Sequence, residues 1–180
     1  PNGASVQQCI ENALSTILRK PISIVGAGRT DAGVHATEMV AHFEVEIPLY
    51  NFEYLCLKLN RFLPKDICIH RIIPVAEGAH ARFHALSRKY QYHLSLVKDP
   101  FRHELHYYYP VPLDFDLMNQ ACEILFDYND YTSFSKLHSD AKTNICHLYE
   151  AHWKQEGSEW VFTICADRFL RNMVRAVVGT

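Results

Sequence analysis

Three glycines within eight residues, Gly26, Gly28 and Gly33, separate two extended segments in the first part of the chain. Glycine tolerates backbone angles that other residues avoid, so this density predicts an irregular loop rather than a helix or a strand. The preceding segment, Ile22–Val25, is short and apolar, and the following one, Met39–Ile47, alternates between polar and apolar residues. Both patterns predict strands, so we expect the loop to be delivered from the core by a strand.

The glycine loop fits neither of two common phosphate-binding motifs. A GxGxxG dinucleotide fingerprint would need its third glycine where Asp31 stands, and a carboxylate there would repel a pyrophosphate. A P-loop would need a Lys followed by Ser or Thr, which the loop lacks. The segment after the loop also has the pattern of a strand, whereas both motifs open a helix. These observations argue against a nucleotide-cofactor oxidoreductase.

Two interpretations of Asp31 follow from the residues alone. Its carboxylate could cap local amides as an ordinary turn residue. Alternatively, a rigid strand and a permissive loop could hold it at the floor of a cleft, with Arg29 two residues away and His35 four away. A neighbouring arginine would keep the carboxylate ionised, as a nucleophile requires.

The rest of the chain alternates between helical and extended patterns. Apolar residues at helical spacing predict helices over 6–18, 52–63, 117–128 and 170–178, the first three capped by Ser5, Asn51 and Asp116. Strands are predicted over 67–75 and 88–97, and a hairpin over 144–155 and 160–166 turns at Gly157 and Ser158. This order predicts an α+β protein with two similar halves, residues 1–85 and 86–180. The chain starts at a turn without Met and ends inside a helix, so we expect both ends to continue beyond this sequence.

Composition excludes several classes of protein. Apolar residues make up 48% and charged residues 21% of the 180 residues, which is a globular mixture. No apolar run approaches the roughly 20 residues needed to cross a bilayer. The six cysteines match no zinc template and are expected to be reduced core residues of a cytoplasmic protein. The net charge of −2 conceals an uneven distribution: 58–89 holds seven basic and two acidic residues, whereas 99–159 holds four basic and eleven acidic ones.

The segment Gly28–Ala36 (GRTDAGVHA) resembles the signature loop of the TruA family, tRNA pseudouridine synthase A. Other pseudouridine synthase families are similar but usually carry Leu rather than Thr before the aspartate. Further blocks resemble the family in the same order along nearly the whole chain: Pro1–Gly3, Ser5–Gln7, Leu59–Ile67, His80–Phe83, Ser87–Tyr92, Asp130–Phe134 and Phe169–Arg175.

The resemblance implies an enzyme that isomerises uridine to pseudouridine in the anticodon stem-loop of tRNA, without a cofactor or a metal. Asp31 matches the family's catalytic aspartate, and whether it attacks the sugar or the base stays open. Tyr90 matches an active-site tyrosine that could help to remove the C5 proton and stack on a flipped base. Arg175 matches an arginine that would orient the carboxylate. By pattern alone, Tyr90 would be a core residue and Arg175 a solvated helix residue.

The implied architecture has two ferredoxin-like or RRM-like halves that form a largely antiparallel central sheet flanked by helices, with the active-site cleft between them. The resemblance also implies a positively charged groove for tRNA, lengthened by the pairing of two chains in a homodimer. His80, Arg82 and His84 are expected to share one strand face. An alternative is a catalytically silent RNA-binding protein of the same fold. The candidate RNA contacts are Arg29, His35, Arg61, Lys65, Arg82, Arg88, Lys89, Arg168 and Arg171.

Overall fold

The computed structural model describes residues 5–45, 51–136 and 143–180. It divides the chain into two units, Pro1–Ala85 (unit 1) and Leu86–Thr180 (unit 2). Their elements together give the predicted α+β class, with a largely antiparallel sheet and flanking helices, so this prediction is confirmed.

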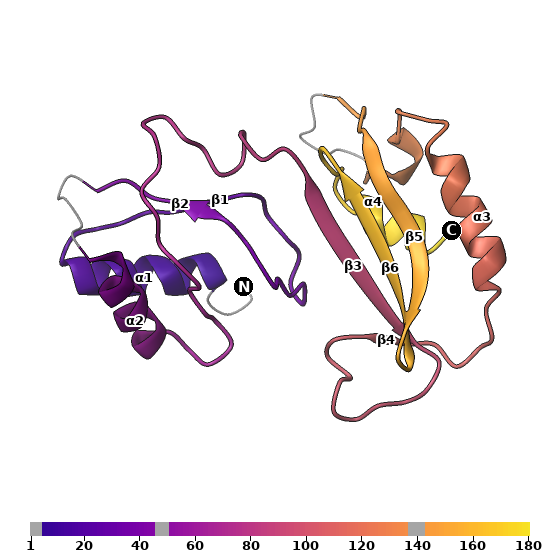
Figure 1. The fold of residues 1–180 in the computed structure, drawn as a ribbon, viewed down its shortest axis with the longest axis horizontal. Helices are drawn as coiled ribbons and strands as arrows, with labels where there is room; N and C mark the ends of the chain where they lie inside the picture. Colours follow the sequence, from indigo (N-terminus) through magenta and orange to yellow (C-terminus); the bar gives the residue numbers. More distant parts are fainter. Residues whose placement is uncertain (1–4, 46–50, 137–142) are drawn as a thin grey trace. The chain divides into compact units, whose positions relative to one another are not determined.

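The described residues of unit 1, 5–45 and 51–85, form two helices and one short pair of strands. Both predicted helix starts are confirmed: the Ser5 hydroxyl accepts a hydrogen bond from Gln8 N–H at 3.2 Å, and the Asn51 side chain accepts one from Tyr54 N–H at 2.8 Å. Figure 1 shows both helices on one side of the strand pair. The elements are α1 (Val6–Leu18), β1 (Val25–Gly26), β2 (Ala41–His42) and α2 (Phe52–Phe62).

The strands of unit 1 are shorter than the sequence predicts. Only Val25 and Gly26 pair with β2, in antiparallel register, and the described part of the predicted 39–47 strand contributes Ala41 and His42. The 67–75 segment contains no strand, because both backbone groups of Ile69 bond the Asn60 side chain of α2, at 2.7 and 2.8 Å, in place of a neighbouring strand. The predicted strand over 67–75 is therefore wrong, and the described part of the predicted 39–47 strand pairs only at Ala41 and His42.

An apolar cluster holds unit 1 together. It joins both helices to the extended segment before β1, and its buried members are Ala13, Leu14, Ile22, Ile24, Leu55, Leu59 and Leu63. Burying side chains of this kind contributes about 1.5–3 kcal/mol each before conformational entropy is counted.

In the whole chain, Cys122, Cys146 and Cys165 are buried but Cys68 is exposed, so the prediction of core cysteines is wrong for Cys68.

Unit 2 is built on a four-stranded sheet of order β4-β3-β6-β5, in which only the β3–β4 pair is parallel. The predicted hairpin between β5 and β6 is confirmed, and Gly157 has the positive φ of 63° that its two-residue turn needs. The elements are β3 (Arg88–Ser95), β4 (Tyr107–Tyr108), α3 (Phe115–Leu125), the 3-10 turn Thr132–Phe134, β5 (Leu148–Glu156), β6 (Glu159–Ala166) and α4 (Met173–Val178).

One face of this sheet carries the main core of unit 2. Tyr90, Tyr92 and Leu94 alternate along β3, and apolar side chains of both α3 and α4 pack into the same cluster. Helix α3 begins at Asp114, whose side chain accepts a bond from Leu117 N–H at 2.9 Å; the prediction of Asp116 as the cap is therefore wrong by two residues.

A buried carboxylate ties the segment between β3 and β4 to the sheet. Glu159 accepts hydrogen bonds from His106 at 2.9 Å and His93 at 3.1 Å, and Arg102 lies 3.1 Å away. Burial favours the neutral acid, but the two histidine hydrogen bonds and the Arg102 charge outweigh it and hold the pKa of Glu159 below its ordinary value.

Helix α3 also holds β5 through a polar contact. The Asn119 side chain accepts a bond from Trp153 N–H at 2.7 Å and donates one to Trp153 C=O at 3.0 Å.

We expect Asn119→Asp to lower the free energy of unfolding by about 1–3 kcal/mol, because it removes the donor and sets a charge against a carbonyl. Urea unfolding measures this, and Asn12→Asp is the control because the Asn12 side chain accepts from Gln8 on an exposed face. Equal losses for the two variants would contradict the prediction.

Candidate functional site

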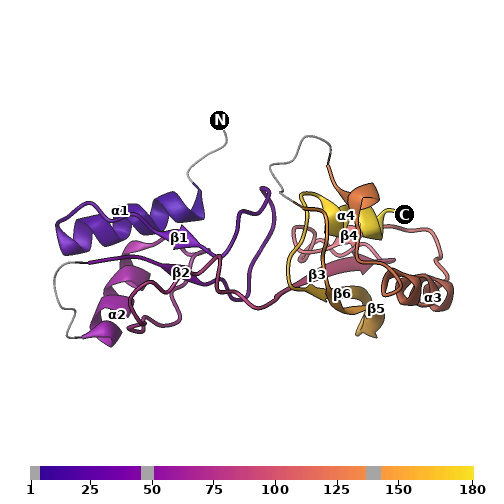
Figure 2. The same ribbon diagram turned by 90° about the horizontal axis from the view of Figure 1, so that it is seen from above.

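The glycine-rich segment forms a loop that projects from the β1–β2 pair (Figures 1 and 2). Its base is closed by a hydrogen bond from Ala27 N–H to Val40 C=O at 2.8 Å. Every residue from 28 to 40 is exposed. Arg29, Asp31 and His35 therefore share one solvent-facing loop, delivered by a short strand as the sequence predicts.

A turn at Asp31 sets the conformation of the loop. Val34 N–H donates to Asp31 C=O at 3.3 Å, and Gly33 between them has a φ of 83°. This positive angle is open to glycine and costly for residues with a Cβ. The Asp31 side chain is exposed beside this turn, where a carboxylate can meet a ligand from solvent.

The prediction that His80, Arg82 and His84 share a strand face is wrong. Residues 81–84 form turns, and His80 Nδ1 accepts a hydrogen bond from Arg82 N–H at 3.2 Å. The turn packs against β2, because Ala81 N–H donates to His42 Nδ1 at 3.1 Å and the His42 and His80 rings lie 4.7 Å apart. Arg82 is exposed at this turn, beside the strand that follows the Asp31 loop.

Tyr90 is half-buried on β3 of unit 2. Its ring meets Phe169 edge to face, with centroids 5.1 Å apart and planes at 85°. Phe169 precedes α4, so this contact links the strand to the segment that leads to Arg175. The ring therefore packs against the core, as its alternation predicts, and the residue stays partly accessible.

Arg175 is exposed on α4, on the sheet face that also carries Tyr90 and Tyr92. Burial raises the pKa of Tyr92, and the positive charge of Arg175 opposes this rise. The electrostatic effect indicates that Arg175 lies near the phenol of Tyr92. Unit 2 therefore brings Tyr90 and Arg175 to one face, and Tyr92 joins them although sequence reasoning did not select it; its i, i+2 spacing from Tyr90 was the available signal.

Three other predicted RNA contacts in unit 2 have local partners. Arg88 donates to Asp167 C=O at 2.9 Å. Lys89 forms an ion pair with Glu150, and this hydrogen bond raises the pKa of Lys89. Arg171 is exposed, and its carbonyl accepts a bond from Lys136 N–H at 3.0 Å.

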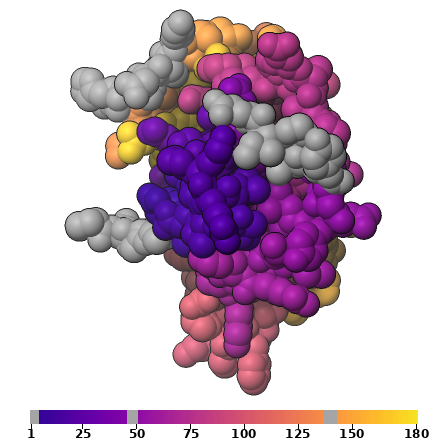
Figure 3. All heavy atoms as spheres, turned by 90° about the vertical axis from the view of Figure 1, so that its left-hand side faces the viewer, coloured from indigo at the N-terminus to yellow at the C-terminus, as the bar shows by residue number. Residues whose placement is uncertain are grey.

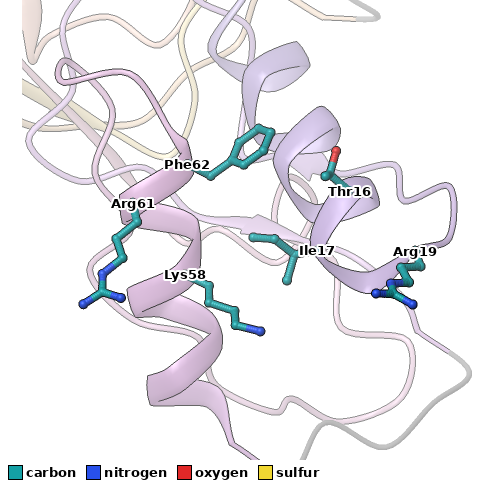
Figure 4. Close-up of a pocket in the computed structure, with 6 residues that line it drawn as sticks. All are labelled: Thr16, Ile17, Arg19, Lys58, Arg61 and Phe62. Atoms are coloured by element: carbon teal, nitrogen blue, oxygen red, sulfur yellow. The ribbon is translucent and has the colours of Figure 1, made fainter.

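Arg61 lies at an open hollow of about 400 Å³ between α1 and α2. The space-filling view in Figure 3 shows the surfaces of these two helices side by side. Ile17 and Phe62 lie between the helices, and Lys58 points from α2 into the space between them (Figure 4). Arg19 lies at the end of α1, and Arg61 points to the side of α2 that faces away from α1. Lys58 Nζ also lies 4.5 Å from the centroid of the Tyr54 ring, above its face. Lys58 and Arg19 are not among the residues predicted from the sequence; the i, i+3 spacing of Lys58 and Arg61 was the available signal.

Two other kinds of site are absent from the described part of the chain. Across 5–45, 51–136 and 143–180, no three His, Cys, Asp or Glu side chains are grouped so that they could hold a metal ion. No helix in these ranges has the length and apolar character needed to cross a membrane.

Comparisons with known proteins identify the family. A family model described as tRNA pseudouridine synthase matches residues 1–84 and 121–180. A protein of Parabacteroides distasonis named tRNA pseudouridine synthase A is 62% identical over 180 residues, which is all of this chain and 71% of that protein. Proteins with the same name from Bacteroides fragilis and Pseudoalteromonas translucida are 55% and 40% identical, over 100% and 97% of this chain and 72% and 67% of their own lengths.

These matches define a class of RNA-modifying isomerase. The chain belongs to the tRNA pseudouridine synthase family, as its motifs indicate, and the resemblance to that family is confirmed. Asp31 and Arg175 fall within the residues that the family model matches, whereas Tyr90 falls in the gap between its two matched parts.

The turn at Gly33 can be tested against the neighbouring Gly28. A Cβ added at either position would meet no atom within 4 Å, but only Gly33 of the two has a positive φ. We expect Gly33→Ala to lower the free energy of unfolding by about 1–2 kcal/mol through backbone strain alone. Gly28→Ala should be neutral or slightly stabilising. Urea unfolding distinguishes them, and equal stabilities would show that the loop does not need the left-handed conformation.

Proposed function

We propose that Asp31 is the nucleophile with which this tRNA pseudouridine synthase isomerises uridine to pseudouridine. The observation that carries the proposal is the exposed Asp31 carboxylate on a loop fixed at its base by the β1–β2 pair and by the Ala27–Val40 hydrogen bond. A carboxylate held in solvent on a braced loop can receive a nucleotide that has been extruded from its stack. An ordinary turn-forming aspartate would not need a loop that projects in this way.

The reaction rearranges bonds without gaining or losing atoms overall. The bond between N1 of uracil and the ribose carbon breaks, the base turns, and C5 forms the new bond to the same carbon. C5 then loses its proton and N1 holds one in the product. A carboxylate can attack and later leave as the base is released and recaptured, so no redox partner is required.

In this proposal unit 2 supplies the supporting groups. The half-buried Tyr90 has a phenol that can assist proton removal at C5 and a ring face on which uracil can stack. Arg175 supplies a positive charge, which favours an ionised and oriented carboxylate. Arg29 and His35 share the Asp31 loop and would contact the flipped nucleotide or its phosphates.

Basic side chains on both units are proposed to bind the tRNA backbone. Arg82 and Arg171 are exposed, and Arg88 and Lys89 have local partners that position them. Extruding a uridine costs about a few kcal/mol and least in a loop, which favours the anticodon stem-loop as the target. We propose that the protein acts in the cytoplasm, where tRNA is modified, and as a homodimer, because a second chain would lengthen the positively charged groove that the resemblance to the family implies.

The assignment of Asp31 can be tested by tritium release from tRNA labelled at C5 of uridine. We expect Asp31→Ala to lower the rate by about 10⁴-fold or more, equivalent to roughly 5 kcal/mol of barrier. Glu38→Ala is the matched control, because Glu38 is another exposed carboxylate on the same loop. It should retain nearly full activity.

Binding of tRNA by Asp31→Ala should persist, because the basic residues supply the affinity. Tritium release by Asp31→Ala at the wild-type rate would refute the catalytic assignment. Loss of both binding and release would assign Asp31 a structural role. A wild-type protein that binds tRNA without releasing tritium would support the alternative, a silent RNA-binding protein.

The basic hollow at Arg61 gives a separate prediction about tRNA affinity. If Arg61 contacts a phosphate, Arg61→Ala should reduce the slope of log affinity against log salt by about 0.9 or less, without changing the rate at saturating tRNA. Fluorescence anisotropy over a salt series measures the slope. Arg71→Ala is the control, since Arg71 is an exposed arginine of the same unit outside the hollow. Identical slopes for the two variants would remove Arg61 from the proposed RNA contacts.

A further inference from the structure

We propose that Gln7, Glu11 and Ser15 of α1 are positioning residues that set the register of the strand delivering Asp31. They are spaced four residues apart, so they lie along one face of the helix. All three bond the backbone of the extended segment immediately before β1. The inference rests on the proposed function, because it assigns these residues a role in placing the Asp31 loop.

These hydrogen bonds satisfy the backbone N–H and C=O groups of two alternate residues of the segment, Ile22 and Ile24. Ile24 N–H donates to Glu11 Oε1 at 2.9 Å, and Ile24 C=O accepts from Gln7 Nε2 at 3.0 Å. Gln7 Nε2 also donates to Glu11 Oε1 at 2.9 Å, which locks the two side chains together. Ile22 N–H donates to the Ser15 hydroxyl at 2.9 Å, and that hydroxyl donates back to Ile22 C=O at 3.4 Å.

The spacing of a helix and a strand explains why this arrangement fits. Four residues of α-helix rise about 6 Å. Two residues of strand rise about 6.6 Å, and alternate residues point their backbone groups to the same side. Glu11 and Ser15 can therefore meet Ile24 and Ile22 in antiparallel register, much as a neighbouring strand would.

This contact matters because little else fixes the register of β1. The β1–β2 ladder has only two residue pairs, Val25 with His42 and Gly26 with Ala41. The buried Ile22 and Ile24 side chains hold the segment to the core, but apolar packing is not directional. The loop with Asp31 begins directly after this ladder, so a shift of the segment before β1 would displace the Asp31 carboxylate.

The adjacent glutamines of α1 provide a matched pair for the test. Gln7 reaches Ile24, whereas the side chain of Gln8 bonds Asn12 on the exposed face of the helix. We expect Gln7→Ala and Glu11→Ala to lower kcat for tritium release by about tenfold, since small displacements of a reacting group are costly. KM for tRNA should stay within roughly twofold of wild type, as the RNA contacts are untouched. Gln8→Ala should match wild type in both.

A second measurement keeps the proposal independent of catalysis. Hydrogen exchange of the Ile24 and Ala27 amides should quicken in Gln7→Ala and Glu11→Ala but not in Gln8→Ala. Glu11→Gln should rescue much of kcat, because its side-chain oxygen can still accept from Ile24. If Asp31→Ala stays active, the proposed function fails, and exchange still reports whether the anchor exists.

Three results would overturn the positioning role. One is equal kcat and exchange for Gln7→Ala and Gln8→Ala. Another is faster exchange with an unchanged kcat, which would leave an anchor without a role in catalysis. The third is a joint loss of kcat, tRNA affinity and thermal stability, because that pattern would mean that the helix contact merely folds unit 1.

Discussion

Helix side chains take the place of neighbouring strands in both units of this protein. Asn60 bonds both backbone groups of Ile69, and Asn119 bonds both backbone groups of Trp153. A carboxamide carries a donor and an acceptor side by side, so it offers an extended residue the same pair of groups that a strand would. Unpaired backbone groups away from water cost about as much as a lost hydrogen bond. Asn60 therefore satisfies a segment that has no strand partner, and Asn119 satisfies the outer edge of β5, whose other edge pairs with β6.

Apolar packing and these polar contacts perform different tasks around the candidate nucleophile. Packing brings the segment before β1 into the core by burying Ile22 and Ile24, but the hydrophobic effect is not directional. A hydrogen bond weakens steeply with poor distance or angle, so the contacts from α1 admit one register. The Asp31 loop depends on this register, since its own ends are joined by a two-residue ladder and one further bond.

The sequence predicted the order of elements better than their partners. Helices and their caps were recognisable because a cap and an apolar stripe are local features, although Asp114 rather than Asp116 starts α3. The predicted strand over 67–75 is wrong because both backbone groups of Ile69 bond a helix side chain, and the predicted strand face at His80 is wrong because the chain turns at residues 81–84. The Asp31 loop was recognisable from its glycines. The bonds from α1 to Ile22 and Ile24 were not, because they join segments that are separated in the sequence.

The number of basic residues in a segment does not show which of them are available to bind RNA. The sequence segment 58–89 has a surplus of basic residues, but these residues occupy different structural settings. Lys89 is paired with Glu150, and Arg88 is held by a backbone carbonyl, so their charges are partly committed to unit 2. Arg61 instead stands with Lys58 at an open hollow on the helices of unit 1. Because a phosphate must displace Glu150 before it binds Lys89, a count of basic residues in the sequence overstates what this side chain adds to RNA affinity.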